Sequence, residues 1–126
     1  MKKKIIKTSN APAPIGPYNQ AIIAGNMLFI SGQIAINPST GELNNNSIAA
    51  EATQVMKNLK AILLEAGCDF SNVVKTCIFL SDMALFSEVN EIYSGFFNDD
   101  YPARETLAVK GLPRNVNVEI SMTALI

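Results

Sequence analysis

Two charged residues in the C-terminal part of the chain, Arg104 and Glu119, have the types and surroundings that small-molecule chemistry requires. Arg104 follows a Pro-Ala pair and stands just before a β-prone segment at residues 106–110. Glu119 lies in a run where apolar and polar residues alternate, so its side chain should leave the face opposite the apolar one. If these two strands pair, an arginine that holds a carboxylate would meet a glutamate that handles water at a sheet edge.

The chain contains no histidine, and this absence limits the chemistry further. Ser-His-Asp and Cys-His nucleophilic catalysis are excluded. Most zinc sites are excluded too, because two distant cysteines, Cys68 and Cys77, and scattered carboxylates do not form a ligand set. The adjacent pair Asp99 and Asp100 precedes Tyr-Pro and is expected to form a turn. We therefore expect no metal site.

Length and charge indicate the broad class. The 126 residues predict one domain, spanning residues 1–126. A net charge of −1 argues against a nucleic-acid partner, which usually requires a basic face. No apolar run approaches membrane-spanning length, and no signal-peptide core follows the N-terminal lysines. Two cysteines without a disulfide framework fit a reducing compartment, so we expect a cytoplasmic protein that contacts no membrane.

Hydrophobic periodicity predicts the elements that must position Arg104 and Glu119. Apolar residues at helical spacing predict a helix from Ser47, which caps it, to Ala66, and a second helix from Asp82 to about Phe97. The Gly-Asn pair at residues 25–26 predicts a hairpin turn. Strands are expected at residues 5–8, 21–24, 27–34, 73–80, 106–110 and 116–125. The resulting order is β-ββ-α-β-α-ββ.

Two helices cannot cover both faces of a six-strand sheet, so they should share one face in a two-layer α+β fold. The other face then carries Glu119, Ser121 and Thr123 among apolar neighbours. Such a face must be solvated or covered by another copy of the chain. Because closed symmetric association is the usual solution, we expect a homo-oligomer.

Short motifs along nearly the whole chain identify a family. They are IGPYNQA at 15–21, LFISGQI at 28–34, NLK at 58–60, AG at 66–67, VNEIY at 89–93, PAR at 102–104, LP at 112–113 and VEI at 118–120. No single motif is decisive, but their order and spacing are specific. The chain resembles the Rid (YjgF-like) family of reactive-intermediate deaminases, and its RidA subgroup in particular.

The resemblance implies a chorismate-mutase-like (YjgF-like) subunit with a six-strand mixed sheet and two helices on one face. It also implies a homotrimer with three ligand clefts at the subunit interfaces. The implied reaction is hydrolysis of the enamine and imine intermediates 2-iminobutanoate and 2-iminopropanoate to 2-oxo acids and ammonia. Such intermediates are released by pyridoxal-phosphate-dependent dehydratases that act on serine or threonine, and the family needs no cofactor.

The resemblance also implies residue roles. Arg104 matches the arginine that holds the substrate carboxylate, and Glu119 matches the glutamate that places the water and relays protons. Tyr18, Ser31 and Asn90 match positions that line the substrate pocket. Taken without the resemblance, Arg104 would be a surface ion-pair residue and Glu119 a solvated strand residue. Ser31 would bond only to nearby backbone, and Tyr18 and Asn90 would be packing and solvent-facing residues.

Two departures from the family pattern concern the strand of Arg104. Glu105 follows the arginine where a small or apolar residue is usual, and its carboxylate would compete for Arg104 unless strand alternation points it away. Thr106 stands where many members have cysteine, so thiol chemistry described for that position does not transfer. Asn19 replaces the more usual serine, which we expect to matter little.

Two other functions remain open at this point. The same pocket could bind a 2-oxo or amino acid without turnover and regulate a partner, and Arg104 favours the enzyme over this alternative. Ribonuclease activity or inhibition of translation, a label attached to some relatives, is the weakest alternative. The chain lacks histidine and has no patch in which basic and aromatic residues alternate.

Overall fold

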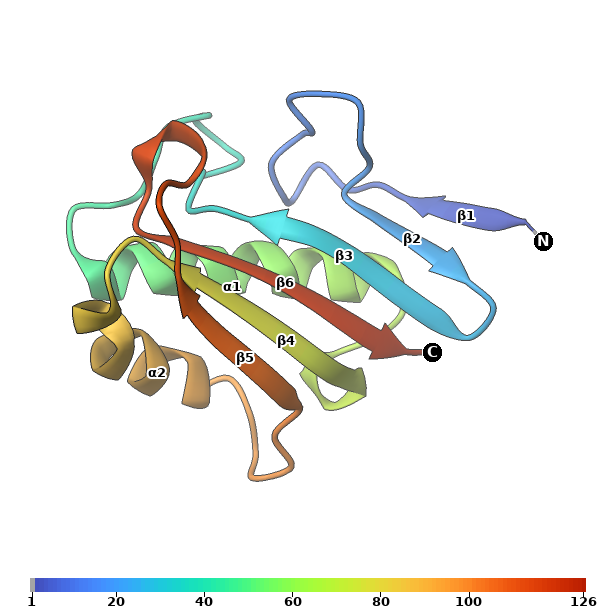
Figure 1. Cartoon of the computed structure of the whole chain (residues 1–126). Coiled ribbons are helices and arrows are strands. Elements are labelled where there is room, and N and C mark those ends of the chain that lie inside the picture. Colours follow the sequence, from blue (N-terminus) through green and yellow to red (C-terminus); the bar gives the residue numbers. More distant parts are fainter. Residues whose placement is uncertain (1) are drawn as a thin grey trace.

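The structure is a computed structural model that describes residues 2–126, and six strands and two α-helices form two layers within them (Figure 1). The predicted element order is confirmed. The elements are β1 (Lys3–Ile6), β2 (Ala21–Ala24), β3 (Met27–Gln33), α1 (Ile48–Glu65), β4 (Val73–Leu80), α2 (Phe86–Ser94), β5 (Ala103–Ala108) and β6 (Val118–Leu125). Three single-turn 3₁₀ helices lie at Phe70–Asn72, Met83–Leu85 and Pro113–Asn115.

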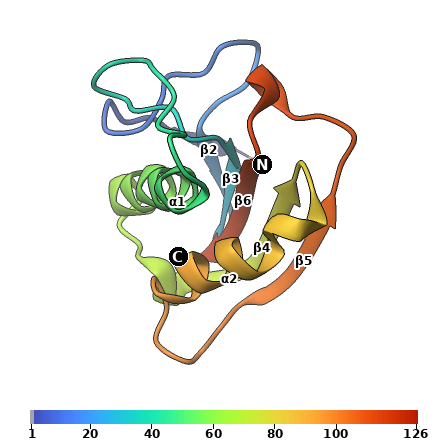
Figure 2. The same ribbon diagram turned by 90° about the vertical axis from the view of Figure 1, so that its left-hand side faces the viewer.

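The strands of residues 2–126 form one six-stranded mixed sheet in the order β1-β2-β3-β6-β4-β5. The β4–β5 pair is parallel, and the other neighbouring pairs are antiparallel. Both α-helices cover the same face of this sheet, as Figure 2 shows. The structure therefore confirms the two-layer α+β fold. No helix within residues 2–126 combines the length and the apolar character needed to cross a membrane.

The strands that carry Arg104 and Glu119 do not pair, so the condition for the two side chains to meet at a sheet edge within one chain is not met. Strand β4 lies between β5 and β6 and pairs with both. Arg104 stands opposite Thr76 of β4, whereas Glu119 stands opposite Phe79. Strands that follow one another in sequence usually lie side by side, but β5 and β6 do not. Instead, β5 pairs in parallel with β4, to which α2 connects it, and β4 lies next to β6.

Helix α1 has the predicted boundaries and provides much of the core. The Ser47 side chain accepts a hydrogen bond from the backbone N–H of Ala50 at 3.0 Å, which satisfies a free donor of the first turn. At the other end Gly67 has a φ of +79°, a conformation that glycine adopts without steric cost. The apolar stripe is buried against the sheet, with Val55, Met56, Leu59, Ile62 and Leu63 fully inaccessible.

The second helix differs from its prediction. Asp82 caps the 3₁₀ turn Met83–Leu85, through a 2.8 Å hydrogen bond from the N–H of Ala84, and α2 begins only at Phe86. The helix ends at Ser94 rather than near residue 97. Two aromatic rings beyond its end, Phe96 and Phe97, pack on Phe70 with centroids 5.6 and 5.3 Å apart. This packing takes the chain away from the helix axis.

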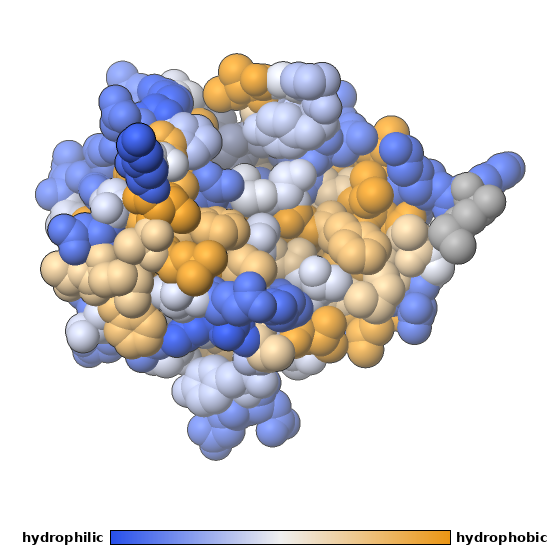
Figure 3. Space-filling view, viewed as in Figure 1, coloured by the Kyte–Doolittle hydropathy of each residue, from blue (hydrophilic) through white to orange (hydrophobic). Residues whose placement is uncertain are grey.

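Strand β6 separates a buried face from an open one. Val118 and Ile120 are fully buried toward the helices, so Glu119, Ser121 and Thr123 point to the other side, as predicted. Large apolar side chains are also exposed on that open face: Ile5, Phe29, Leu107 and Leu125. Figure 3 shows this face with apolar patches over the strands. An open face of this composition favours a covering partner over solvent.

Candidate active site

The carboxylate of Glu119 lies against the backbone of Gly32. A Cβ atom placed on Gly32 would be 2.9 Å from Cδ of Glu119, so a side chain there would displace the carboxylate. The close approach occurs where the pairing of β3 with β6 shifts register between Ile30 and Gln33. An irregularity of this kind re-aims side chains beside it and creates room in an otherwise continuous sheet.

Partial burial changes the acid–base properties of Glu119. Desolvation raises the pKa of its carboxyl group above the ordinary value for glutamate. A raised pKa moves the group toward the range in which it both accepts and returns a proton near neutrality. The carboxylate is thus suited to general acid–base catalysis.

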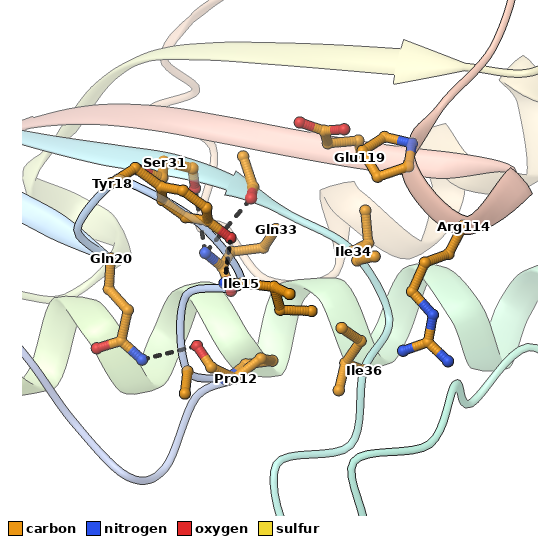
Figure 4. A pocket seen from close by; sticks show the side chains of 13 residues that line it. Pro12, Ile15, Tyr18, Gln20, Ser31, Gln33, Ile34, Ile36, Arg114 and Glu119 are labelled. Carbon is orange, nitrogen blue, oxygen red and sulfur yellow. Dashed lines mark hydrogen bonds between the residues drawn. The ribbon is translucent and has the colours of Figure 1, made fainter.

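Glu119 borders a pocket of about 480 Å³ that contains two of the three predicted binding residues (Figure 4). Tyr18 is half exposed, and its hydroxyl accepts a 3.5 Å hydrogen bond from the N–H of Ile15. The Ser31 hydroxyl donates to the carbonyl oxygen of Asn19 at 2.6 Å. Its hydroxyl therefore already has a backbone partner, twelve residues away in sequence, and Ser31 also lines the pocket.

The far side of this pocket contains a cation, Arg114, that was not among the predicted site residues. Arg114 lines the pocket together with Pro113, and Figure 4 shows its side chain near Ile36. Both Arg114 and Asn115 have a φ of 55°, in the left-handed region that non-glycine residues rarely adopt. Consecutive left-handed residues give the turn before β6 a defined shape, and no simple sequence signal announces it.

Arg104 lies in a different depression, lined by Asn90, Tyr93, Ser94, Tyr101 and Pro102. One guanidinium nitrogen donates to Oδ1 of Asn90 at 2.7 Å. The guanidinium carbon also lies 5.6 Å from the ring centroid of Phe86 and 5.2 Å from that of Tyr93. Asn90, predicted to line the substrate pocket, lies beside Arg104 in this depression.

Glu105 does not compete for the arginine. Its carboxylate forms an ion pair with the Lys75 ammonium at 3.1 Å on the open sheet face, while Arg104 contacts helix α2. Among residues 2–126, Arg104 forms no ion pair. Thr106 shares the helix-side face with Arg104, and its buried hydroxyl oxygen has no hydrogen-bond partner within the same residues. Strand alternation therefore leaves the guanidinium free to take an external anion.

A single chain does not bring Arg104 and Glu119 together. The arginine is on the helix side of β5, and the glutamate is on the open side of β6 with β4 between them. The depressions that contain them share no lining residue. The predicted residues thus form two separate groups, with Tyr18 and Ser31 near Glu119 and with Asn90 near Arg104.

Glu51 is a buried acidic residue that positions the strand of Glu119 and that was not among the predicted site residues. It is fully inaccessible, and its carboxylate accepts hydrogen bonds from the backbone N–H groups of Asn117 and Val118 at 2.7 and 3.0 Å. The Asn117 side-chain amide adds a third bond at 3.1 Å. The one available signal was the position of Glu51 three residues after Ile48, on the apolar stripe of its helix.

Within residues 2–126, no three histidine, cysteine, aspartate or glutamate side chains are arranged to hold a metal ion. The polar side chains that line the two depressions instead carry a carboxylate, hydroxyls, amides and two guanidinium groups. Such groups bind and orient an organic anion and transfer protons.

Comparisons with known proteins found similar chains and a matching family model. A family model described as "Endoribonuclease L-PSP" matches residues 8–126. A human protein named 2-iminobutanoate/2-iminopropanoate deaminase is 45% identical over 123 residues, which cover 98% of this chain and 90% of that protein. A Lactococcus lactis protein named "Putative regulator AldR" is 50% identical over 121 residues, 96% of each chain. The crystal structure of the YjgF gene product of E. coli superimposes with a TM-score of 0.92 at 45% identity, covering 97% of this chain and 98% of that one.

Proposed function

The chain belongs to the Rid (YjgF-like) family, and on this premise we propose that it hydrolyses reactive 2-imino acids to 2-oxo acids and ammonia. The substrates would be 2-iminobutanoate and 2-iminopropanoate, after which the human relative is named. The observation that carries the proposal is the presence, in one chain, of an arginine without an ion-pair partner among residues 2–126 and of a desolvated glutamate, each in its own depression. An imino acid requires both groups, one for its carboxylate and one for the water.

The Arg104 guanidinium would hold the substrate carboxylate through two parallel hydrogen bonds, which fix its orientation as well as neutralise its charge. Asn90 occupies one N–H donor of the guanidinium, and the remaining donors are available for this contact. Since an imine carbon is already electrophilic, placing water against it removes much of the remaining barrier.

Glu119 would perform the proton transfers. Its carboxylate takes a proton from the water as the water oxygen bonds to the imine carbon, and the carbon–nitrogen double bond becomes a single bond. It returns that proton to the nitrogen, which gives a carbinolamine. The carboxylate then takes the proton of the new hydroxyl group and delivers it to the amino nitrogen, so the carbonyl forms as the carbon–nitrogen bond breaks and ammonia leaves. Such general acid–base catalysis typically contributes about 10²–10⁴-fold to the rate. The reaction consumes one water and needs no electron acceptor, and we propose that no cofactor takes part.

A second copy of the chain would complete the site. Arg104 and Glu119 leave opposite faces of the sheet, so the helix side of β5 in one copy must approach the open face of another. The exposed apolar residues Phe29 and Leu107 on that open face support such a contact. We place the chain in a homotrimer in which three clefts between subunits each unite one arginine with one glutamate.

A ligand-binding regulator is the second candidate, and the name of the L. lactis relative is the observation that favours it. The same depressions would then hold a 2-oxo or amino acid without turnover. In either case the expected setting is the cytoplasm, where dehydratases release imines, and the two free thiols Cys68 and Cys77 fit a reducing compartment. Binding of 2-oxobutyrate without imine hydrolysis would support the regulator.

The decisive experiment adds the purified protein to a threonine dehydratase reaction that contains semicarbazide, which captures free imine. The deaminase predicts faster formation of 2-oxobutyrate and less semicarbazone. Arg104→Ala should lose this effect while it keeps the native circular dichroism spectrum and assembly size. Lys57→Ala, an exposed change on α1, is the matched control and should keep the activity. An unchanged partition of the imine, with a folded and assembled protein, would contradict the proposal.

A further inference from the structure

Two aromatic rings of helix α2 flank the guanidinium of Arg104. The guanidinium carbon lies 5.2 Å from the ring centroid of Tyr93 and 5.6 Å from that of Phe86. Both distances are within the range in which an aromatic face attracts a cation. Tyr93 also belongs to the hydrophobic core and Phe86 packs against it, so contact with the arginine is a second role for both rings.

The ring of Tyr93 is itself firmly held. Tyr93 is 3% exposed, and its hydroxyl donates to the hydroxyl oxygen of Thr76 at 2.9 Å. Its ring packs against Phe97 with centroids 4.8 Å apart. Thr76 is fully buried and is the β4 residue that stands opposite Arg104 in the parallel pair. The sheet register therefore fixes both the backbone of the arginine and the ring beside its guanidinium.

We infer that Phe86 and Tyr93 are positioning residues that orient the Arg104 guanidinium for the substrate carboxylate. This inference rests on the proposed function for the identity of the anion, and on the contacts above for the rings. Asn90 would fix the rotation of the guanidinium through its 2.7 Å hydrogen bond, while the rings restrict its tilt. Arg104 then reaches the binding step already ordered and loses little conformational entropy there.

Aromatic neighbours suit this task better than a carboxylate. An acidic side chain would order the guanidinium equally well, but it would neutralise the charge and occupy the N–H fork that the substrate needs. Ring faces attract the cation and leave its N–H groups free. The nearest acidic residue in sequence, Glu105, is held by Lys75 on the other face. Its contacts thus hold Arg104 in place, while no ion-pair partner occupies it among residues 2–126.

Removing the Tyr93 ring will also reduce stability, because the residue is buried. A lower melting temperature in Tyr93→Leu is therefore expected whether or not the ring orients Arg104. The readout must follow the arginine itself, and its control must keep the ring while it removes the hydroxyl. Tyr93→Phe provides that control, since it loses only the bond to Thr76.

The first test is nuclear magnetic resonance of protein labelled with ¹⁵N-arginine. The chain has two arginines, Arg104 and Arg114, so two side-chain Nε–H signals are expected, and Arg104→Lys assigns them. A ring displaces the signals of protons beside its face. Tyr93→Leu and Phe86→Leu should each shift the Arg104 signal and leave that of Arg114 in place, whereas Tyr93→Phe should leave both nearly unchanged. If the Arg104 signal shifted in neither Tyr93→Leu nor Phe86→Leu, the inference would be overturned.

The second test measures the affinity of the assembled protein for 2-oxobutyrate in a double-mutant cycle. Tyr93→Leu should weaken binding roughly 3- to 30-fold, the range of a cation–π contact, and Tyr93→Phe less than about 2-fold. In an Arg104→Ala background, Tyr93→Leu should have little further effect. An equal loss in both backgrounds would mean that Tyr93 acts through packing alone and would overturn the inference.

The two tests separate this inference from the proposed function. If the wild-type protein binds 2-oxobutyrate and the cycle shows coupling, but no imine is hydrolysed, the deaminase proposal fails while the positioning role stands. If the wild-type protein hydrolyses imine and the Arg104 signal is unaffected by the ring substitutions, the positioning role fails while the deaminase proposal stands. In an active enzyme, Tyr93→Leu should raise KM more than it lowers kcat, because carboxylate binding and not proton transfer depends on it.

Discussion

The carboxylate of Glu119 occupies the space that a side chain on residue 32 would fill. A Cβ on Gly32 would lie 2.9 Å from Cδ of the glutamate, closer than real Cβ atoms come, and 3.1 Å from Cγ, tighter than most real contacts. The φ of Gly32 is outside the left-handed region, so the backbone conformation alone does not require glycine there. The absence of a side chain is therefore explained by the room that Glu119 needs.

Gly32→Ala should leave the fold intact and reduce the turnover number. The added methyl group meets the far end of a flexible side chain, so the carboxylate moves and the backbone does not. A displaced acid–base group commonly costs about 10²-fold in rate. We expect a fall of roughly that size in kcat for imine hydrolysis, with a KM within a few-fold of wild type. Steady-state kinetics and a melting curve together check both parts.

Gly111→Ala is the matched control, since nothing lies within 4 Å of a Cβ at that position and its backbone is not left-handed. It should keep both activity and stability. Equal kinetics for Gly32→Ala and wild type would show that the position of the Glu119 carboxylate does not matter for turnover.

Glu119→Gln should abolish most activity and, at neutral pH, stabilise the fold. Desolvation raises the pKa of Glu119, so the folded state holds this proton to a higher pH than the unfolded state does. The free energy of unfolding therefore falls as the pH rises from the unfolded-state pKa of Glu119 to its folded-state pKa. The glutamine variant has no such group to ionise and shows no such fall. The melting temperature of the variant should exceed that of wild type at pH 7. The difference in melting temperature between the variant and the wild type should disappear as the pH falls to the ordinary glutamate pKa of about 4.3.

The same raised pKa moves the acidic limb of the kcat/KM profile of the wild-type enzyme to higher pH than an ordinary glutamate would give. If the melting-temperature advantage of Glu119→Gln over the wild type grew as the pH fell, it would contradict the stability prediction. It would show that Glu119 is stabilised as an anion in the folded state.

Glu51→Ala should be strongly destabilising. It removes the acceptor of three hydrogen bonds and leaves the N–H groups of Asn117 and Val118 buried without a partner, at a cost of about 3–5 kcal/mol. Glu51→Gln keeps an acceptor oxygen and should cost about 1–2 kcal/mol. Urea unfolding at fixed protein concentration measures both values.

Glu65→Ala, an exposed change at the end of the same helix, is the control and should stay within about 0.5 kcal/mol of wild type. If Glu51→Ala matched this control, the carboxylate would not anchor the start of β6.

Two inactive variants should restore activity when their subunits are mixed. Arg104→Ala keeps the glutamate and Glu119→Gln keeps the arginine, so a cleft shared between copies regains both wild-type groups in some pairings. Random mixing of equal amounts in a closed ring should recover roughly a quarter of the wild-type activity. The assay is run after the two proteins are unfolded and refolded together. Each variant refolded alone is the control. No recovery, with assembly verified, would place the whole site within one copy.

Local patterns in the sequence predicted most of the fold. The alternation in β6 placed Glu119 on the open face, and Ser47 capped α1 as expected, because each follows from neighbouring residues alone. The same alternation correctly separated Glu105 from Arg104. These relationships extend over only a few residues, and backbone geometry enforces them.

Relationships between distant residues escaped prediction. The insertion of β4 between β5 and β6 depends on how the helices pack, and no local signal reports it. The bonds from Asn117 and Val118 to Glu51 span 66 and 67 residues, so a helix propensity could not reveal them. The contact of Tyr93 with Arg104 was hidden for another reason: an aromatic residue on the inner face of a helix already has an adequate role in the core.

The strand order has a consequence for how the chain comes together during synthesis. β6 is the last element along the chain, yet it lies in the centre of the sheet between β3 and β4. While β6 is still inside the ribosome, the β1–β3 meander and the β4–α2–β5 unit have no strand to join them, and their inner edges are unpaired. The sheet therefore closes after translation of β6 rather than growing in step with it, and Glu119 reaches its place beside Gly32 in that same final event.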